Sequence, residues 1–109
     1  MIIDFLNLPY EDIPHFKDGE GQLHVQMYWD GETRAMHGVL APGASIGLHR
    51  HEANCEILFL LRGHATLLED GERHSLIAGQ ATFCPNQHEH SLINTGAEDV
   101  EFYAAVIKQ

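Results

Sequence analysis

Short runs of apolar or alternating residues follow one another along most of the 109-residue chain. Alternation of apolar and polar positions is typical of strands, whose side chains point to opposite faces in turn. No stretch shows the apolar stripe of an amphipathic helix. The pattern predicts strands over residues 23–29, 34–41, 45–51, 56–62, 64–70, 72–77, 81–85, 90–94 and 100–107.

Turn-forming residues separate these runs and indicate antiparallel pairing. The strongest hairpin signals are Asp30 with Gly31 and Asp70 with Gly71, because a type I′ turn needs the positive φ that these residues tolerate. An antiparallel sheet that closes on itself loses its exposed edges and leaves room for one ligand inside. We therefore expect an all-β chain that forms a single antiparallel β-barrel.

Residues 1–22 are the least patterned part of the chain. Pro9 and Pro14 exclude a long helix there. Several apolar residues nevertheless need burial, so we expect the segment to add an edge strand to its own barrel or to a partner's. These residues are Ile2, Ile3, Phe5, Leu6 and Leu8. No linker or internal repeat divides residues 1–109, which predicts a single domain.

The charge balance excludes two classes of partner. Sixteen acidic residues against six basic ones give a net charge of -10, which repels nucleic acid and anionic membrane surfaces. The longest apolar run, ILFLL, is too short to span a bilayer, and the N-terminus lacks the basic region of an export signal. We expect a cytoplasmic protein. Its two cysteines, Cys55 and Cys84, are then interpreted as reduced, buried thiols rather than a redox pair.

Three residues in the middle of the chain have a spacing that can hold a metal ion. His49 and His51 are two apart on a predicted strand and therefore share a face. If the polar break after them is a tight turn, Glu56 returns on the neighbouring antiparallel strand and faces both histidines. His90 opens a later strand and supplies a fourth ligand. This donor set suits Fe, Mn, Ni, Co, Cu or Zn better than Ca or Mg, so we expect one divalent transition metal per chain.

With these residues in place, the chain resembles the cupin family, which has two signature motifs. The first, Gly-x5-His-x-His-x4-Glu-x6-Gly, is matched across residues 43–63; the second, Gly-x5-Pro-x-Gly-x2-His-x3-Asn, is matched across residues 79–94 except at Gln87, which replaces a glycine. This departure predicts a changed backbone at that turn or a glutamine side chain in the site. The matching residues are Gly43, His49, His51, Glu56, Gly63, Gly79, Pro85, His90 and Asn94.

The resemblance implies a jelly-roll-like barrel, also described as a double-stranded β-helix, with a mononuclear three-His, one-Glu site. Cupins are commonly dimers that pair through N-terminal strands, so we expect a homodimer. Cupins with all four ligands include dioxygenases and isomerases acting on small oxygenated molecules, and the dioxygenase is our first interpretation. A lyase or decarboxylase and a non-catalytic module that binds a small molecule through the metal are the alternatives.

Catalysis would need groups besides the metal. Glu56 is a candidate for orienting a bound water, and His88 for general acid or base chemistry, with Glu89, His37 or a tyrosine as substitutes. An exposed loop position is the competing interpretation of His88. Four other histidines are predicted to face solvent: His15, His24, His64 and His74.

The expected cavity wall follows from strand alternation. Ser45 and Gly47 share the face of the ligand histidines, and Leu58 and Leu60 share that of Glu56. Arg50 should point away, which leaves Arg34 as the only arginine near the site and disfavours a polyanionic substrate. Further wall candidates whose facing the sequence leaves open are Tyr28, Trp29, Met36, Phe83, Phe102 and Tyr103.

Overall fold

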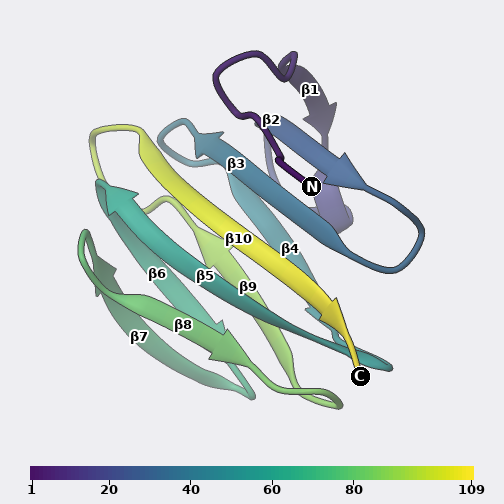
Figure 1. Ribbon diagram of the computed structural model, residues 1–109. Helices are drawn as coiled ribbons and strands as arrows, with labels where there is room; N and C mark the ends of the chain where they lie inside the picture. The colour runs from purple at the N-terminus through teal and green to yellow at the C-terminus, as the bar shows by residue number, and fades with distance from the viewer.

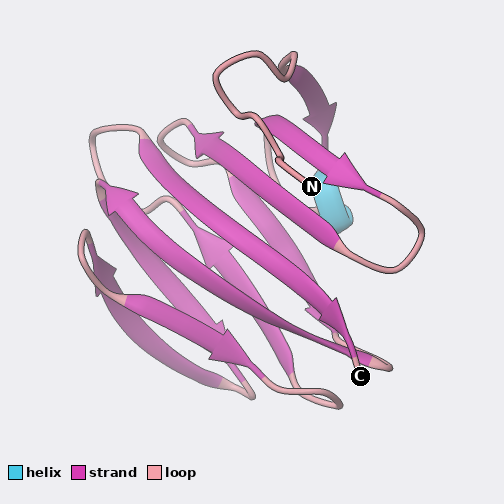
Figure 2. Ribbon diagram, in the orientation of Figure 1, coloured by secondary structure: helices cyan, strands magenta, loops and turns pink.

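A computed structural model describes residues 1–109 as two antiparallel sheets that face each other. Figure 1 shows the six-stranded sheet in front of the four-stranded one, and Figure 2 shows that strands make up almost all of the regular structure. The sheet orders are β1-β2-β3-β10-β5-β8 and β4-β9-β6-β7. The elements are β1 (Glu11–Pro14), η1 (Phe16–Asp18), β2 (Gln22–Trp29), β3 (Arg34–Leu40), β4 (Ser45–Arg50), β5 (Asn54–Arg62), β6 (His64–Glu69), β7 (Glu72–Ile77), β8 (Ala81–Cys84), β9 (Glu89–Ile93) and β10 (Val100–Lys108).

All nine predicted strands are present, and their ends differ from the prediction by at most two residues. The tenth strand, β1, lies in the poorly patterned segment of residues 1–22 and pairs with β2 at the edge of its own sheet. The edge strand is thus built by Glu11–Pro14 and not by the apolar residues that precede it. Pro14 is tolerated there because proline lacks a backbone N–H, and one side of an edge strand has no neighbouring strand that would accept a hydrogen bond from it.

The predicted closed barrel is replaced by a jelly-roll-like sandwich of two sheets. The reason is that the chain repeatedly crosses from one sheet to the other. Between β4 and β5, His51 donates its backbone N–H to the carbonyl of His88, and Ala53 adopts a left-handed φ of 62°. This turn carries the chain across the gap, so β4 and β5 are not the hairpin neighbours that the sequence suggested.

Both strong hairpin signals are confirmed by the pairing of β2 with β3 and of β6 with β7. Only the second has two central residues with positive φ, at 47° for Asp70 and 83° for Gly71. In the first, the Asp30 carboxylate accepts the backbone N–H groups of Glu32 and Thr33 and so closes a longer loop.

A core of apolar side chains fills the space between the sheets. Leu23, Val25 and Phe102 are fully buried, and each such side chain stabilises the fold by about 1.5–3 kcal/mol. The Phe102 ring packs directly against Gly38. Only glycine fits there, because an added Cβ would lie 2.4 Å from the ring. The core continues toward the candidate ligands through Ile46, Leu58 and Leu92.

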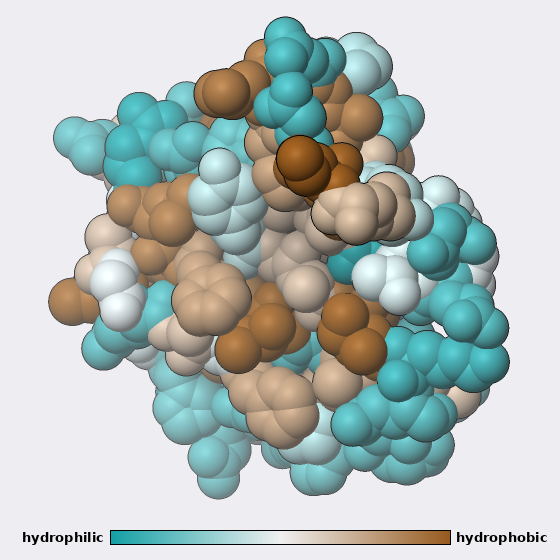
Figure 3. Space-filling model, viewed as in Figure 1, coloured by the Kyte–Doolittle hydropathy of each residue, from teal (hydrophilic) through white to brown (hydrophobic).

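Residues 1–10 cover part of the outer face of the six-stranded sheet. The Gln26 side chain donates to the carbonyls of Phe5 and Leu8, and the Phe5 ring lies 5.4 Å from that of Tyr103. Much of the rest of this face is apolar and exposed, as the brown and tan areas in Figure 3 show. Its large side chains are 40–52% exposed: Phe59, Leu61, Phe83, Tyr103 and Ile107. The structure has no helix long and apolar enough to cross a membrane.

Candidate metal centre

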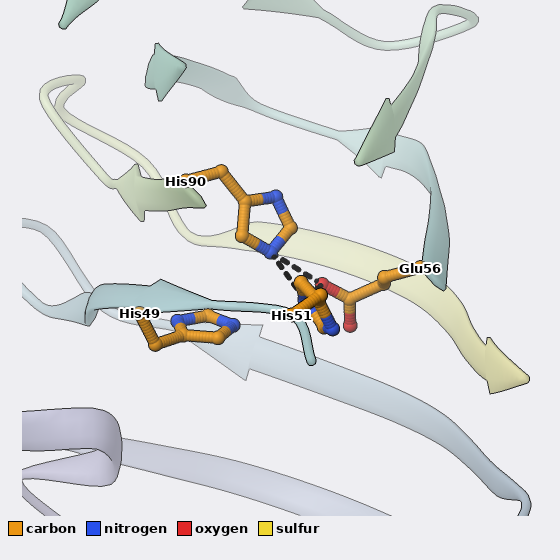
Figure 4. Close-up of side chains that lie close together, drawn as sticks. All are labelled: His49, His51, Glu56 and His90. Atoms are coloured by element: carbon orange, nitrogen blue, oxygen red, sulfur yellow. Dashed lines mark hydrogen bonds and ion pairs between the residues drawn. The ribbon is translucent and has the colours of Figure 1, made fainter. Parts of the chain in front are cut away.

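Four side chains from both sheets meet at one point between the layers. His49 on β4 is the Cα partner of His90 on β9, His51 directly follows β4, and Glu56 projects from β5 in the opposite sheet. One donor atom from each lies within 4.8 Å of every other (Figure 4). The structure therefore brings together the four residues that were predicted from the sequence. Glu56 faces the histidines across the gap between the sheets rather than from a neighbouring strand.

Hydrogen bonds on the far side of two imidazoles fix their orientation. The Nδ1 atoms of His49 and His51 lie 2.7 Å from the Gly47 carbonyl and from the Asn54 side-chain oxygen, respectively. Because these oxygens only accept, each Nδ1 carries a hydrogen, and each Nε2 is the nitrogen left to bind an ion when the ring is neutral. This arrangement is common for metal-binding histidines, whose second nitrogen donates to a fixed oxygen.

The carboxylate at the centre of the group is charged. Burial by itself raises the pKa of Glu56, but hydrogen bonds from His51 and His90 outweigh it and lower the value to about 2. The His90 Nε2 lies 2.8 Å from the Glu56 oxygen and 3.0 Å from the His51 Nε2. These direct contacts join the atoms that would bind one ion.

The histidines respond differently to the same surroundings. Burial lowers the pKa of His49 to about 4, so this imidazole is neutral at physiological pH. Burial also lowers the pKa of His51, but hydrogen bonds to Glu56 and Asn54 outweigh it and leave the value raised. The site thus combines a buried carboxylate with a histidine that holds its proton more tightly than a free imidazole does.

The donor set fits one divalent transition metal ion. Nitrogen and oxygen ligands bind such ions at about 2.0–2.2 Å, so donors on opposite sides of an ion are about 4 Å apart. The 4.8 Å limit on the group is close to that span. Three imidazoles and one carboxylate favour transition metals, and four protein ligands leave an octahedral ion two positions for water or a ligand.

A cavity of about 220 Å³ opens beside the ligands. Three of the six Lys and Arg residues of the chain line it: Lys17 from η1, Arg34 from β3 and Arg50 from the end of β4. Arg50, which was predicted to point away from the metal, is exposed at the end of β4 and borders the cavity there. The other lining residues are Phe16, Trp29, Met36, Ile46, His49, His51, Asn54, Glu56 and Val106.

The remaining wall predictions have mixed outcomes. Trp29 and Met36 line the cavity, whereas Leu60 and Phe102 lie in the core. Leu58 borders a small space on the core side of the ligands. Gly47 packs against η1, because a Cβ there would lie 1.9 Å from the Lys17 carbonyl oxygen. The candidates that lie elsewhere, outside this lining, are Tyr28, Ser45, Phe83 and Tyr103.

Residues with proposed catalytic roles outside the ligand set lie away from the cavity. His88 is exposed, and its Nδ1 is 2.6 Å from the Asp70 carboxylate. His37 is buried on the outer side of its sheet, where its Nε2 lies 2.6 Å from Glu101. His15, His24, His64 and His74 are exposed, as predicted.

Gln87 has the backbone conformation that a glycine at this position would favour. Its φ is 75°, its N–H donates to the His51 carbonyl, and its side chain is exposed. Both expectations for this position are therefore wrong, because the tight turn around His51 fixes the backbone and directs the side chain to solvent. Two further residues of the site were not predicted from the sequence. Asn54 is an amide two residues before a ligand, which was a usable signal, whereas no local pattern marks Lys17.

A family model described as the Cupin domain matches residues 36–106, which make up more than half of the chain. The chain belongs to the cupin family. Among relatives of this cupin, the oxalate-binding protein of Thermotoga maritima is 31% identical over 98% of this chain and 93% of its own length. The beta-alanine degradation protein BauB of Pseudomonas aeruginosa is 44% identical over 62% of this chain and 74% of its own length.

Solved structures agree with the fold. The crystal structure of a protein from Thermotoga maritima, described as a predicted oxalate decarboxylase, superposes with a TM-score of 0.91. The two chains are 29% identical, and the match covers all of both. This cupin therefore has known structural relatives over its whole length, including the segment before the family match.

We predict that acidification weakens metal binding, beginning near neutral pH. An imidazole must be neutral to bind, and the raised pKa of His51 makes its proton the first competitor, whereas His49 competes only near pH 4. Affinity should fall by about tenfold per pH unit below the His51 pKa. Competition with a coloured chelator between about pH 8 and about pH 5 measures this. A constant affinity over that range would contradict it.

Proposed function

We propose that this cupin binds a small carboxylate anion through a divalent metal ion held by His49, His51, Glu56 and His90. The observation that carries the proposal is the gathering of Lys17, Arg34 and Arg50 around the cavity in a chain of net charge -10. Positive charge in a cleft concentrates anions there. Carboxylate oxygens are also suitable ligands for the two open positions of the ion.

The size of the cavity and the names of the relatives support the same class of ligand. About 220 Å³ is below the roughly 300–1,000 Å³ of sites for drug-sized molecules, so the ligand is small. The relatives from Thermotoga maritima are named for oxalate, the smallest dicarboxylate. The positive lining argues against the expectation from the sequence that a polyanionic substrate is disfavoured.

Binding is favoured over a reaction because the cavity lining has no carboxylate or histidine outside the ligand group. Glu56 is the only carboxylate in the lining, and it serves as a metal ligand. His88, the proposed proton-transfer group, is exposed and held by Asp70. A bound metal would supply Lewis acidity, and the residues of the chain would orient the anion. Dioxygenase, isomerase and decarboxylase activities are the alternatives that the experiment below tests.

Titration of the metal-loaded protein with oxalate tests the proposal. Trp29, the only tryptophan of the chain, lines the cavity, so its fluorescence reports binding. We expect saturable binding of oxalate, no binding of an uncharged analogue such as oxamide, and loss of oxalate binding after the metal is removed. The lack of any metal-dependent carboxylate binding would refute the proposal. Oxygen uptake would support a dioxygenase instead, and anaerobic turnover an isomerase or decarboxylase.

We also propose that the protein is a homodimer in which residues 1–8 and the bare sheet face meet a second copy. Met1, Ile2 and Leu6 are at least 90% exposed, and Phe5 places this segment beside Tyr103 on the apolar face. Two copies of so acidic a chain repel each other over most of their surface. The repulsion is smallest where the mostly uncharged faces of β5, β8 and β10 meet.

Deletion of residues 1–8 is expected to shift the protein from dimer to monomer, because it removes exposed apolar side chains that a second copy would cover. Light scattering measures the mass of both proteins. Replacing exposed Leu48 on β4 with Ala serves as a control that should leave the dimer intact. A monomeric wild-type protein would show that the proposal is wrong.

A further inference from the structure

The cavity is bordered by cations that form no ion pair within the protein. None of the eight ion pairs of the structure involves Lys17, Arg34 or Arg50. The Nε of Arg34 is in addition buried without any hydrogen-bond partner, and it is the only such side-chain atom in the structure. An unpaired buried donor is costly, so it marks a place where a ligand can supply the missing acceptor.

Two aromatic rings hold the Arg34 guanidinium in place. Its central carbon lies 4.8 Å from the centre of the Trp29 ring and 6.0 Å from that of Phe16. Guanidinium groups stack well on aromatic faces and keep their N–H groups free at the edge of the plane. Arg34 is therefore fixed in orientation at the cavity before any ligand arrives.

The backbone that presents Phe16 and Lys17 is strained. His15, Lys17 and Asp18 have φ values of 51°, 55° and 63°, in the left-handed region that residues other than glycine adopt at a cost in free energy. Close packing of η1 on β4 at Gly47 enforces this conformation. Strain of this kind concentrates where a segment is held for binding, and here it places a cation and a ring at the cavity wall.

We propose that Arg34, aided by Lys17, binds a second carboxylate of the ligand, so that this cupin selects short dicarboxylates with an apolar spacer. The inference rests on the proposed function, in which the metal takes the first carboxylate. Arg34 can receive the second one through two parallel N–H donors, and Lys17 adds a point charge. Met36, Ile46 and Val106 line the same cavity and suit the methylene groups between the carboxylates.

Succinate and butyrate provide a matched test, because they share a four-carbon chain and differ in one carboxylate. In the metal-loaded wild type, followed by Trp29 fluorescence, succinate should bind at least about tenfold more tightly than butyrate. Arg34→Gln should remove this difference while leaving metal content unchanged. Arg73→Gln, which alters an exposed arginine on β7, is the control and should keep the difference.

Lys17→Gln provides a second variant at an exposed position and should reduce the preference for succinate by a smaller factor, about two- to fivefold. Equal binding of succinate and butyrate to the wild type, with oxalate still bound, would overturn the inference and leave the proposed function standing. A preference that survives Arg34→Gln would overturn it as well. If none of the three anions binds the metal-loaded wild type, the proposed function itself fails.

Discussion

His51→Ala is expected to reduce bound metal from about one ion per chain to a small fraction of that amount. His51 is 5% exposed, contacts both His90 and Glu56, and is held by Asn54, so its loss removes a protein ligand that is fixed in place. Loss of one of four protein ligands should weaken binding by more than the 10- to 100-fold typical of losing a supporting hydrogen bond. Elemental analysis after purification measures the metal content.

The same variant should lose the thermal stabilisation that metal gives the wild type. An ion that binds only the folded state raises its stability in proportion to the logarithm of its concentration over the dissociation constant. His74→Ala is the matched control, because His74 is exposed on β7 and far from the ligand group in the fold. Equal metal content in wild type and His51→Ala would mean that the four residues are not the metal site.

Gly47→Ala is expected to destabilise the protein by about 1–3 kcal/mol and to displace η1 from the cavity wall. The added Cβ would lie 1.9 Å from the Lys17 carbonyl oxygen and 2.7 Å from the Gly19 nitrogen. Both are backbone atoms, so no side-chain rotation can relieve the contact. Urea unfolding gives the free-energy change. The fluorescence of Trp29, which lines the same cavity as Phe16, reports the displacement of η1.

Leu48→Ala is the control for this change at the neighbouring position. Leu48 is 56% exposed, so its truncation should alter the free energy of unfolding by less than about 0.5 kcal/mol. If Gly47→Ala unfolds at the same urea concentration as the wild type, η1 does not pack on β4 as described. Packing on β4 would then not be what holds Lys17 in its left-handed conformation.

The sequence alone determined the strands and the four candidate ligands. Alternation located nine strands because each has one face toward the core, and the Asp-Gly pairs located two hairpins because few other residues tolerate the turn. The ligands could be chosen because residue type and spacing were fixed together by two motifs. An edge strand was expected within residues 1–22, but its position at β1 could not be located because a short edge strand needs no apolar face.

The tertiary structure decided everything that depends on which strands meet. Whether Glu56 faces the histidines from the next strand or from the opposite sheet is set by the crossing turn at residues 51–53, whose left-handed Ala53 no pattern indicated. The cations at the cavity come from η1, β3 and β4, which are distant in sequence. Local patterns report only which face of an element is buried. The charge of a cavity depends on packing between elements, so only the fold revealed that this acidic chain presents a positive site.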